Sequence, residues 1–263
     1  MSLLSDTSGG SRLQQRWDLL RELTVRELKI RYKRSYLGIG WSLLNPLSQL
    51  LIFSFLFGTV VPLNIPHYTA FVFTGVLAWS WFSSALTGST AAIGANTELV
   101  RRPGFPVSVL PLLTVASNGI HYVLALPVLL LFAYVDSGGM GLSVTALPLV
   151  MIVQFVLTLG LVYLTSAAFV YFRDVQHLLL IFVMLGFYMT PVFYRANNAP
   201  EEIQFLYTYN PMAVLLEAYR EILIQHRWPD FSDLAAVLVF GLAACAAGYA
   251  FFNRAILQLV DDL

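Results

Sequence analysis

The sequence offers few residues whose types and spacing could carry out a reaction. Its two lysines, Lys29 and Lys33, lie near the N-terminus, and no G-x-x-x-x-G-K phosphate loop, H-E-x-x-H metal motif or G-x-S-x-G nucleophile motif occurs. Cys245 is a lone thiol in an apolar run, and no Cys or His spacing indicates a metal site. We therefore predict that the chain is not an enzyme and holds no cofactor or metal of its own.

Titratable groups are sparse within the apolar runs. No run holds a buried carboxylate pair or a proton relay, which ion-coupled transporters commonly use. His121 and His177 are the candidates near these runs, and a lone histidine there is usually a packing residue. Asp174 and Glu98 are too isolated for the clustered site that a polytopic membrane acyl- or glycosyltransferase needs. A membrane enzyme and an ion-driven transporter are the alternatives from other classes.

The composition of the chain indicates what class of protein holds these residues in place. Of 263 residues, 58% are hydrophobic and only 11% are charged, whereas about a quarter of a soluble domain is charged. Six apolar runs are long enough to cross a bilayer as helices. They are Gly38–Val61, Tyr68–Ile93, Val107–Val135, Ala146–Phe172, Gln176–Tyr194 and Asp233–Phe252. We predict an all-α polytopic membrane protein with six transmembrane helices within residues 35–263. Gly241, Ala244 and Gly248 form a small-residue face for close helix packing.

Basic residues predict how the helices are oriented. Twelve of the fifteen Lys and Arg residues fall on one side of the predicted spans, and only Arg195, Arg220 and Arg227 fall on the other. The positive-inside rule then places both termini in the cytoplasm, which requires an even number of spans. Residues 1–34 are polar and basic, and they do not read as a secretory signal.

Three segments outside the spans have patterns of their own. Within residues 1–34, an amphipathic helix carries Leu13, Trp17, Leu20, Thr24 and Leu28 on one face, and we expect it to lie at the cytoplasmic interface. It is either a topology anchor or a mobile element at an entrance. Residues 94–106 contain one or two helical turns before Pro103, which either project toward a partner or form a capped loop.

The third segment, residues 195–231, is too long for a simple outer connection. We predict a short helix over Pro200–Tyr207 and a second over Met212–Gln225, in which Asn210 is the cap and Pro211 occupies the first helical position. Glu217 and Arg220 are spaced for an i,i+3 pair. The segment is either a gate or a static cap.

Aromatic residues are frequent in the predicted spans. Interfacial Trp and Tyr belts account for many of them. An uncharged aromatic path would also suit sugars, because the apolar C–H faces of pyranose rings stack on aromatic rings. Our candidates for such a path are Trp41, Phe53, Phe57, Phe182 and Tyr188.

Five stretches in this order resemble the permease subunit of bacterial ABC exporters for O-antigen and related cell-surface polysaccharides. They are RELKIRYKRSYLGIGWSLLNPL at Arg26–Leu47, LVRRPGFPVSVLPL at Leu99–Leu112, YFRDV at Tyr171–Val175, TPVFY at Thr190–Tyr194 and YNPM at Tyr209–Met212. The resemblance covers nearly the whole chain.

The resemblance implies an assembly in the bacterial inner membrane. Two copies of the permease would form the channel, and two copies of a separate ABC ATPase would supply ATP and Mg²⁺ chemistry from the cytoplasm. The cargo would be a lipid-linked glycan surrounded by membrane lipids, and no nucleic-acid partner is expected. Teichoic acid, capsule and lipo-oligosaccharide are alternative cargoes, and a drug-efflux permease fits the motifs less well.

The resemblance also implies roles for particular residues. The coupling helix that contacts the ATPase would include Asn96, Glu98, Arg101, Arg102, Pro103 and Phe105. The gate helix and the entrance for the lipid diphosphate would include Trp17, Lys29, Arg31, Lys33 and Arg34. The basic residues either bind the diphosphate or only obey the positive-inside rule. The periplasmic gate would include Asn210, Pro211, Glu217 and Arg220.

Overall fold

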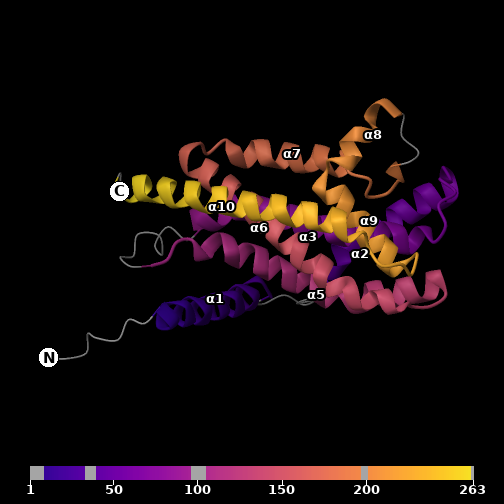
Figure 1. Ribbon diagram of the computed structural model, residues 1–263, viewed down its shortest axis with the longest axis horizontal. Coiled ribbons are helices and arrows are strands. Elements are labelled where there is room, and N and C mark those ends of the chain that lie inside the picture. The colour runs from indigo at the N-terminus through magenta and orange to yellow at the C-terminus, as the bar shows by residue number, and fades with distance from the viewer. Residues whose placement is uncertain (1–8, 33–39, 96–104, 197–200, 262–263) are drawn as a thin grey trace.

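The computed structural model describes residues 9–32, 40–95, 105–196 and 201–261, and every regular element in those ranges is a helix (Figure 1). The long helices lie side by side in one bundle, which confirms the prediction of an all-helical chain. In chain order the elements are α1 (Gly9–Tyr32), α2 (Trp41–Phe55), the π-helical turn η2 (Leu56–Val60), α3 (Tyr68–Ala95), α5 (Val109–Ser137), the 3₁₀ turn η3 (Leu142–Ala146), α6 (Leu147–Tyr171), α7 (Val175–Met189), α8 (Glu201–Thr208), α9 (Pro211–Leu223) and α10 (Phe231–Asp261).

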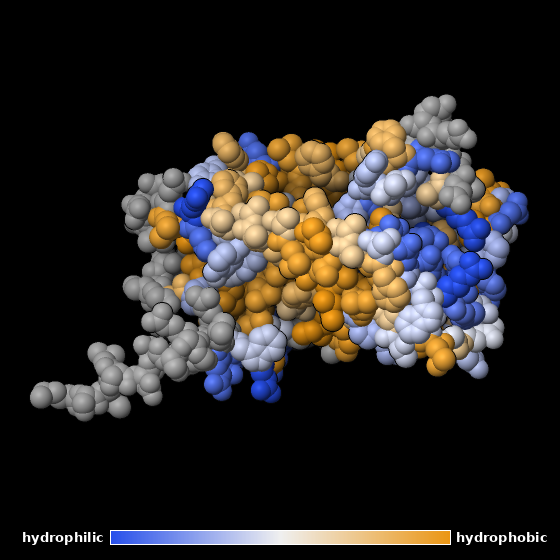
Figure 2. All heavy atoms as spheres, viewed as in Figure 1, coloured by the Kyte–Doolittle hydropathy of each residue, from blue (hydrophilic) through white to orange (hydrophobic). Residues whose placement is uncertain are grey.

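Five stretches of these helices are long and apolar enough to cross a membrane. They are Leu43–Val60, Tyr68–Ala91, Val109–Ser137, Leu142–Tyr171 and Phe231–Leu257. Each falls on a predicted span, with its ends shifted by a few residues. On the face shown in Figure 2, apolar residues form a band across the middle of the bundle, and hydrophilic residues gather toward its ends.

The remaining predicted span is represented by α7, which is shorter than expected. Its 15 residues cover about 22 Å at 1.5 Å per residue, whereas the hydrocarbon layer is about 30 Å thick. The helix ends at Met189 because Thr190 is extended (φ −94°, ψ 138°) and precedes Pro191, which disfavours helical backbone before it. The prediction of a continuous helix to Tyr194 is therefore wrong, and six spans remain a proposal.

The helix pair α6–α10 is packed at backbone contact. A Cβ added at Gly160 would lie 2.7 Å from the backbone nitrogen of Cys245, and one at Gly248 would lie 2.8 Å from the carbonyl oxygen of Gly160. Gly241 is similarly close to Leu157. This confirms the predicted small-residue face and shows that α6 is its partner.

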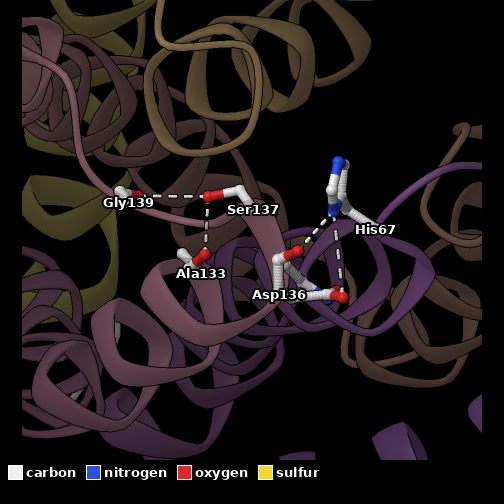
Figure 3. A network of polar contacts seen from close by, with 6 residues as sticks. His67, Ala133, Asp136, Ser137 and Gly139 are labelled. Atoms are coloured by element: carbon white, nitrogen blue, oxygen red, sulfur yellow. Dashed lines mark hydrogen bonds and ion pairs between the residues drawn. The ribbon is translucent and has the colours of Figure 1, made fainter.

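At one end of the bundle, the loop before α3 is fastened to the end of α5 (Figure 3). His67 Nδ1 lies 2.5 Å from the carbonyl oxygen of Asp136 and 3.9 Å from its Oδ1, while Oδ2 accepts a hydrogen bond from the Ala70 backbone N–H at 2.9 Å. Ser137 Oγ donates to the carbonyl oxygen of Ala133 at 2.6 Å. The bonds of His67 and Asp136 hold α3 and α5 together at the end of the bundle that lies opposite to α1.

Candidate functional site

The N-terminal helix α1 lies against α5, at the end of the bundle where α5 begins (Figure 1). Leu20 and Thr24 are buried there, and Glu27 accepts a hydrogen bond from Ser117 Oγ at 3.3 Å. Trp17, predicted on the same apolar face as Leu20 and Thr24, is 68% exposed and lies outside the part of that face that α5 covers. The packed face therefore runs through Leu20, Thr24 and Glu27.

The predicted entrance and coupling residues are described only in part. Lys29 is exposed on α1, and Arg31 lies in the same helix, but the structure describes only its backbone. Lys33, Arg34, Asn96, Glu98, Arg101, Arg102 and Pro103 fall outside the described residues. Phe105 is partly buried and packs on the cluster that contains Leu20 and Leu110. Their roles in coupling and at an entrance stay predictions.

Two of the predicted path aromatics meet in one cluster around Phe193. The ring centroids of Phe53 and Phe57 lie 5.2 and 5.4 Å from that of Phe193, and both rings are nearly parallel to it. Phe187 lies 5.9 Å from both Phe53 and Phe193. The cluster joins the end of α2 and η2 to α7 and to the turn that follows it. Neither Phe187 nor Phe193 was among the predicted path residues, although Phe193 lies in the TPVFY motif.

The other three candidates are largely uncovered by the rest of the chain. Trp41, Phe182 and Tyr188 are 57%, 69% and 60% exposed. Only Tyr188 joins the cluster, with its ring 6.1 Å from that of Phe193. The five predicted aromatics therefore do not form one continuous surface within a single protomer.

Helix α9 begins as predicted. Asn210 Oδ1 accepts hydrogen bonds from the backbone N–H groups of Met212 and Ala213 at 3.0 and 3.4 Å, and Pro211 occupies the first turn. Asn210 Nδ2 also donates to Thr190 Oγ1 at 3.0 Å. The cap therefore also fastens α9 to the end of α7. The predicted shorter helix before it is α8.

Arg220 forms the predicted i,i+3 ion pair with Glu217 and is also buried against two other elements. Its side chain is 2% exposed, and its Nη2 donates to the carbonyl oxygens of Pro191 and Val192 at 2.7 and 2.8 Å. The guanidinium lies 3.5 Å from the ring centroid of Phe71 in α3. The predicted partner Glu217 is 4.0 Å away and more than half exposed. Most of the binding of Arg220 is therefore to the turn after α7 and to α3.

An acidic cavity lies beside this arginine. It has a volume of about 660 Å³ between the end of α7, α9 and the start of α10. Burial, followed by the neighbouring carboxylates, raises the pKa of Glu221 in its wall. Burial lowers the pKa of Arg220 to about 9, which leaves it charged at neutral pH. The charged residues that line the cavity are Arg195, Arg220, Glu217, Glu221, Asp230 and Asp233.

A buried glutamine also fixes α9, and the sequence analysis did not single it out. Gln154 in α6 is fully buried; its Nε2 donates to the carbonyl oxygen of Ala78, and its Oε1 accepts from the Tyr219 hydroxyl, both at 2.8 Å. A lone amide within the apolar run LVMIVQFVLTL is the signal that could have identified it. In the described part of the chain, no group of three or more His, Cys, Asp or Glu residues is arranged to hold a metal ion.

Long apolar helices, with a first helix at one end of the bundle and two short helices packed at the other, define a polytopic membrane protein. The family model of the ABC-2 type transporter matches residues 18–224, and the chain belongs to this family.

Relatives that are named as polysaccharide transport proteins match almost the whole chain. The O-antigen export system permease protein RfbA of Myxococcus xanthus is 35% identical over 243 residues, which are 92% of this chain and 94% of that protein. A protein of the same name from Klebsiella pneumoniae is 34% identical over 239 residues, covering 90% and 92%. The polysialic acid transport protein KpsM of Escherichia coli is 23% identical over 237 residues, covering 88% and 91%.

Proposed function

We propose that this chain is the membrane-spanning subunit of an ATP-driven exporter that moves a lipid-linked surface polysaccharide out of the bacterial cytoplasm. The observation that carries the proposal is the identity of 34–35% to O-antigen export permeases over nine tenths of the chain. Identity to the polysialic acid transporter is lower, so an O-antigen-like glycan is favoured over a capsule, a teichoic acid or a lipo-oligosaccharide.

The working unit in this proposal is a pair of permeases with a pair of ABC ATPase subunits. The first apolar span supports the pairing, because only 11% of its residues are buried by its own chain. ATP and Mg²⁺ act on the ATPase, which binds at the inner face of the cytoplasmic membrane. Both termini lie on that side, and α7 together with the turn after it completes a sixth crossing.

In this proposal, the conformational change of the ATPase is transmitted to the permease by the coupling residues Asn96, Glu98, Arg101, Arg102, Pro103 and Phe105. The basic residues Lys29, Arg31, Lys33 and Arg34 receive the diphosphate of the carrier lipid, since clustered cations bind phosphate strongly. At the other end, α8 and α9 close the path. The bonds from Asn210 to Thr190 and from Arg220 to Pro191 and Val192 support this, because they join α9 to the end of α7 and to the turn after it.

The test begins with deletion of the gene in its source organism. We expect loss of the surface polysaccharide and accumulation of its lipid-linked form inside the cell, and an unchanged surface would overturn the proposal. In complemented cells, the combined variant Glu98→Gln, Arg101→Gln and Arg102→Gln should reduce co-purification of the ATPase or export at least severalfold. Membrane insertion should stay intact. Arg254→Gln, in the last helix, serves as the matched control and should retain both.

A further inference from the structure

A second cavity lies in the half of the bundle where α2 and α5 begin. It has a volume of about 320 Å³ and is lined by residues of α2, α3 and α5. Small-molecule sites commonly span about 300–1,000 Å³, so this cavity has room for one small ring system. It adjoins the region where Glu27 of α1 meets Ser117, because the next residue of α5, Asn118, lines it.

The lining of this cavity is polar but without fixed charge. Trp41 and Trp81 contribute aromatic surface, and Asn45, Asn118 and Ser84 contribute amide and hydroxyl groups. Apart from the titratable His121, none of its described lining residues carries an ionisable side chain that is charged at neutral pH. An apolar ligand such as a hydrocarbon chain would leave the polar groups of the cavity without hydrogen bonds, and a diphosphate would have no cationic side chain to bind. An uncharged ligand rich in hydroxyl groups fits both conditions.

One aromatic wall is rigid and the other is accessible. Trp81 is 5% exposed, and its Nε1 donates to the Val115 carbonyl oxygen at 3.2 Å. Gly119 allows this position, because a Cβ there would lie 3.0 Å from the Trp81 ring. Trp41 is largely exposed at the start of α2. A planar or chair-shaped ring could therefore enter past Trp41 and rest against a fixed indole.

Tyr122 completes this wall. It is 3% exposed, and its ring centroid lies 5.2 Å from that of Trp81, so the two rings pack against each other.

We propose that this cavity binds one sugar ring of the exported glycan before it crosses the membrane. The inference rests on the proposed function and adds a location and a ligand class. The amides and hydroxyls bind the hydroxyl groups of the sugar, the indoles contact its C–H faces, and the carrier diphosphate stays outside with the basic N-terminal residues. The cavity thus selects the glycan by its sugar, separately from its charge.

The binding test uses the full chain in lipid nanodiscs. The probes are the methyl glycosides of glucose, galactose, mannose, rhamnose and N-acetylglucosamine, with glycerophosphoethanolamine as a lipid-headgroup probe. Binding is followed by tryptophan fluorescence and by saturation-transfer NMR of the probe. We expect saturable binding of at least one glycoside. Binding of no glycoside, or of the headgroup probe alone, overturns the inference.

Two pairs of variants locate the binding. Ser84→Phe fills the cavity and should abolish binding, whereas Ala91→Phe on the exposed surface of the same helix should not. Asn45→Ala removes one hydrogen-bonding group and should weaken binding roughly three- to tenfold, whereas Ser48→Ala, one turn further along α2, should leave it unchanged. Wild-type affinity in the Ser84→Phe variant would place the sugar elsewhere.

Export in cells separates this inference from the function on which it depends. If deletion abolishes the surface polysaccharide while the Ser84→Phe variant restores it fully, the export function stands and the cavity assignment falls. If deletion leaves the polysaccharide intact, both fall. Loss of export in Ser84→Phe, with normal export in Ala91→Phe, supports both.

Discussion

Hydrogen bonds from single polar side chains help to position α9 in an otherwise apolar bundle. Gln154 satisfies both the Ala78 carbonyl and the Tyr219 hydroxyl, and the residues of this bridge are almost fully enclosed. A buried polar group that loses its partner costs about 1–3 kcal/mol, whereas removal of both partners is nearly neutral. The bridge between α6 and α9 therefore contributes to stability as a pair.

A double-mutant cycle tests this bridge. Gln154→Leu should lower the free energy of unfolding by about 1–3 kcal/mol, because the Tyr219 hydroxyl then stays buried without an acceptor. Tyr219→Phe should cost less than the glutamine variant, and the double variant should recover part of that loss. The measurement is thermal or denaturant unfolding of the purified protein in detergent. Strict additivity of the two changes would show that the bond carries no coupling.

The raised pKa of Glu221, in the wall of the acidic cavity, makes the stability of the protein depend on pH. Because the folded protein holds this proton more tightly than the unfolded chain, its stabilising contribution is present below the usual pKa of 4.5 and is lost as pH rises through the folded value. Glu221→Gln should therefore raise the melting temperature at neutral pH and make no difference below pH 4.5. Glu217→Gln is the control and should give no gain, since Glu217 lies beside Arg220. A gain that is independent of pH would contradict the assignment.

At the scale of single residues, the sequence predicted those contacts whose partners are close neighbours in the chain. The Asn210 cap and Pro211 were predictable because their partners lie two and three residues away. The main partners of Arg220 were not, since Pro191, Val192 and Phe71 are distant in sequence and only packing brings them together. The apolar face predicted for α1 is confirmed at Leu20 and Thr24, which are buried, but periodicity alone could not show that α5 leaves Trp17 on the same face uncovered.

At the scale of elements, the glycines of α6 and α10 decide how closely two long helices approach. Hydropathy alone predicted the five membrane-crossing stretches to within five residues at each end, because each is a long apolar run between polar segments, although α10 itself continues nine residues past the predicted end, to Asp261. It failed at α7, where Thr190 and Pro191 end the helix although the apolar residues continue. Hydropathy measures preference for lipid and does not register a backbone break.

Enlarging one of these glycines should separate the pair. Gly248→Ala places a methyl group 2.8 Å from the Gly160 carbonyl oxygen, so the helices must shift apart. We expect a loss of about 1–3 kcal/mol in the free energy of unfolding, as for other overpacked cores. Gly58→Ala is the matched control, because no atom lies within 4 Å of its added Cβ, and its effect should stay within about 0.5 kcal/mol. Equal melting temperatures for both variants would refute the close contact.

For the whole molecule, the number of crossings decides on which side the last helix ends. Five crossings put the two termini on opposite sides of the membrane, and six put them on the same side. We expect epitope tags at both ends to be protected in intact spheroplasts and to become accessible together after permeabilisation. A C-terminal tag that is accessible before permeabilisation would show that α7 does not complete a crossing.

Two apolar helices, α2 and α7, are barely covered by their own chain, and this has a consequence for what shapes their sequences. Within one chain, α7 buries only Leu179, and the first span is almost equally uncovered. Most positions on these helices therefore lie outside the core formed by α3, α5, α6 and α10. If the permeases pair as proposed, the side chains of α2 and α7 are selected by the second copy and by the cargo more than by the fold of their own chain.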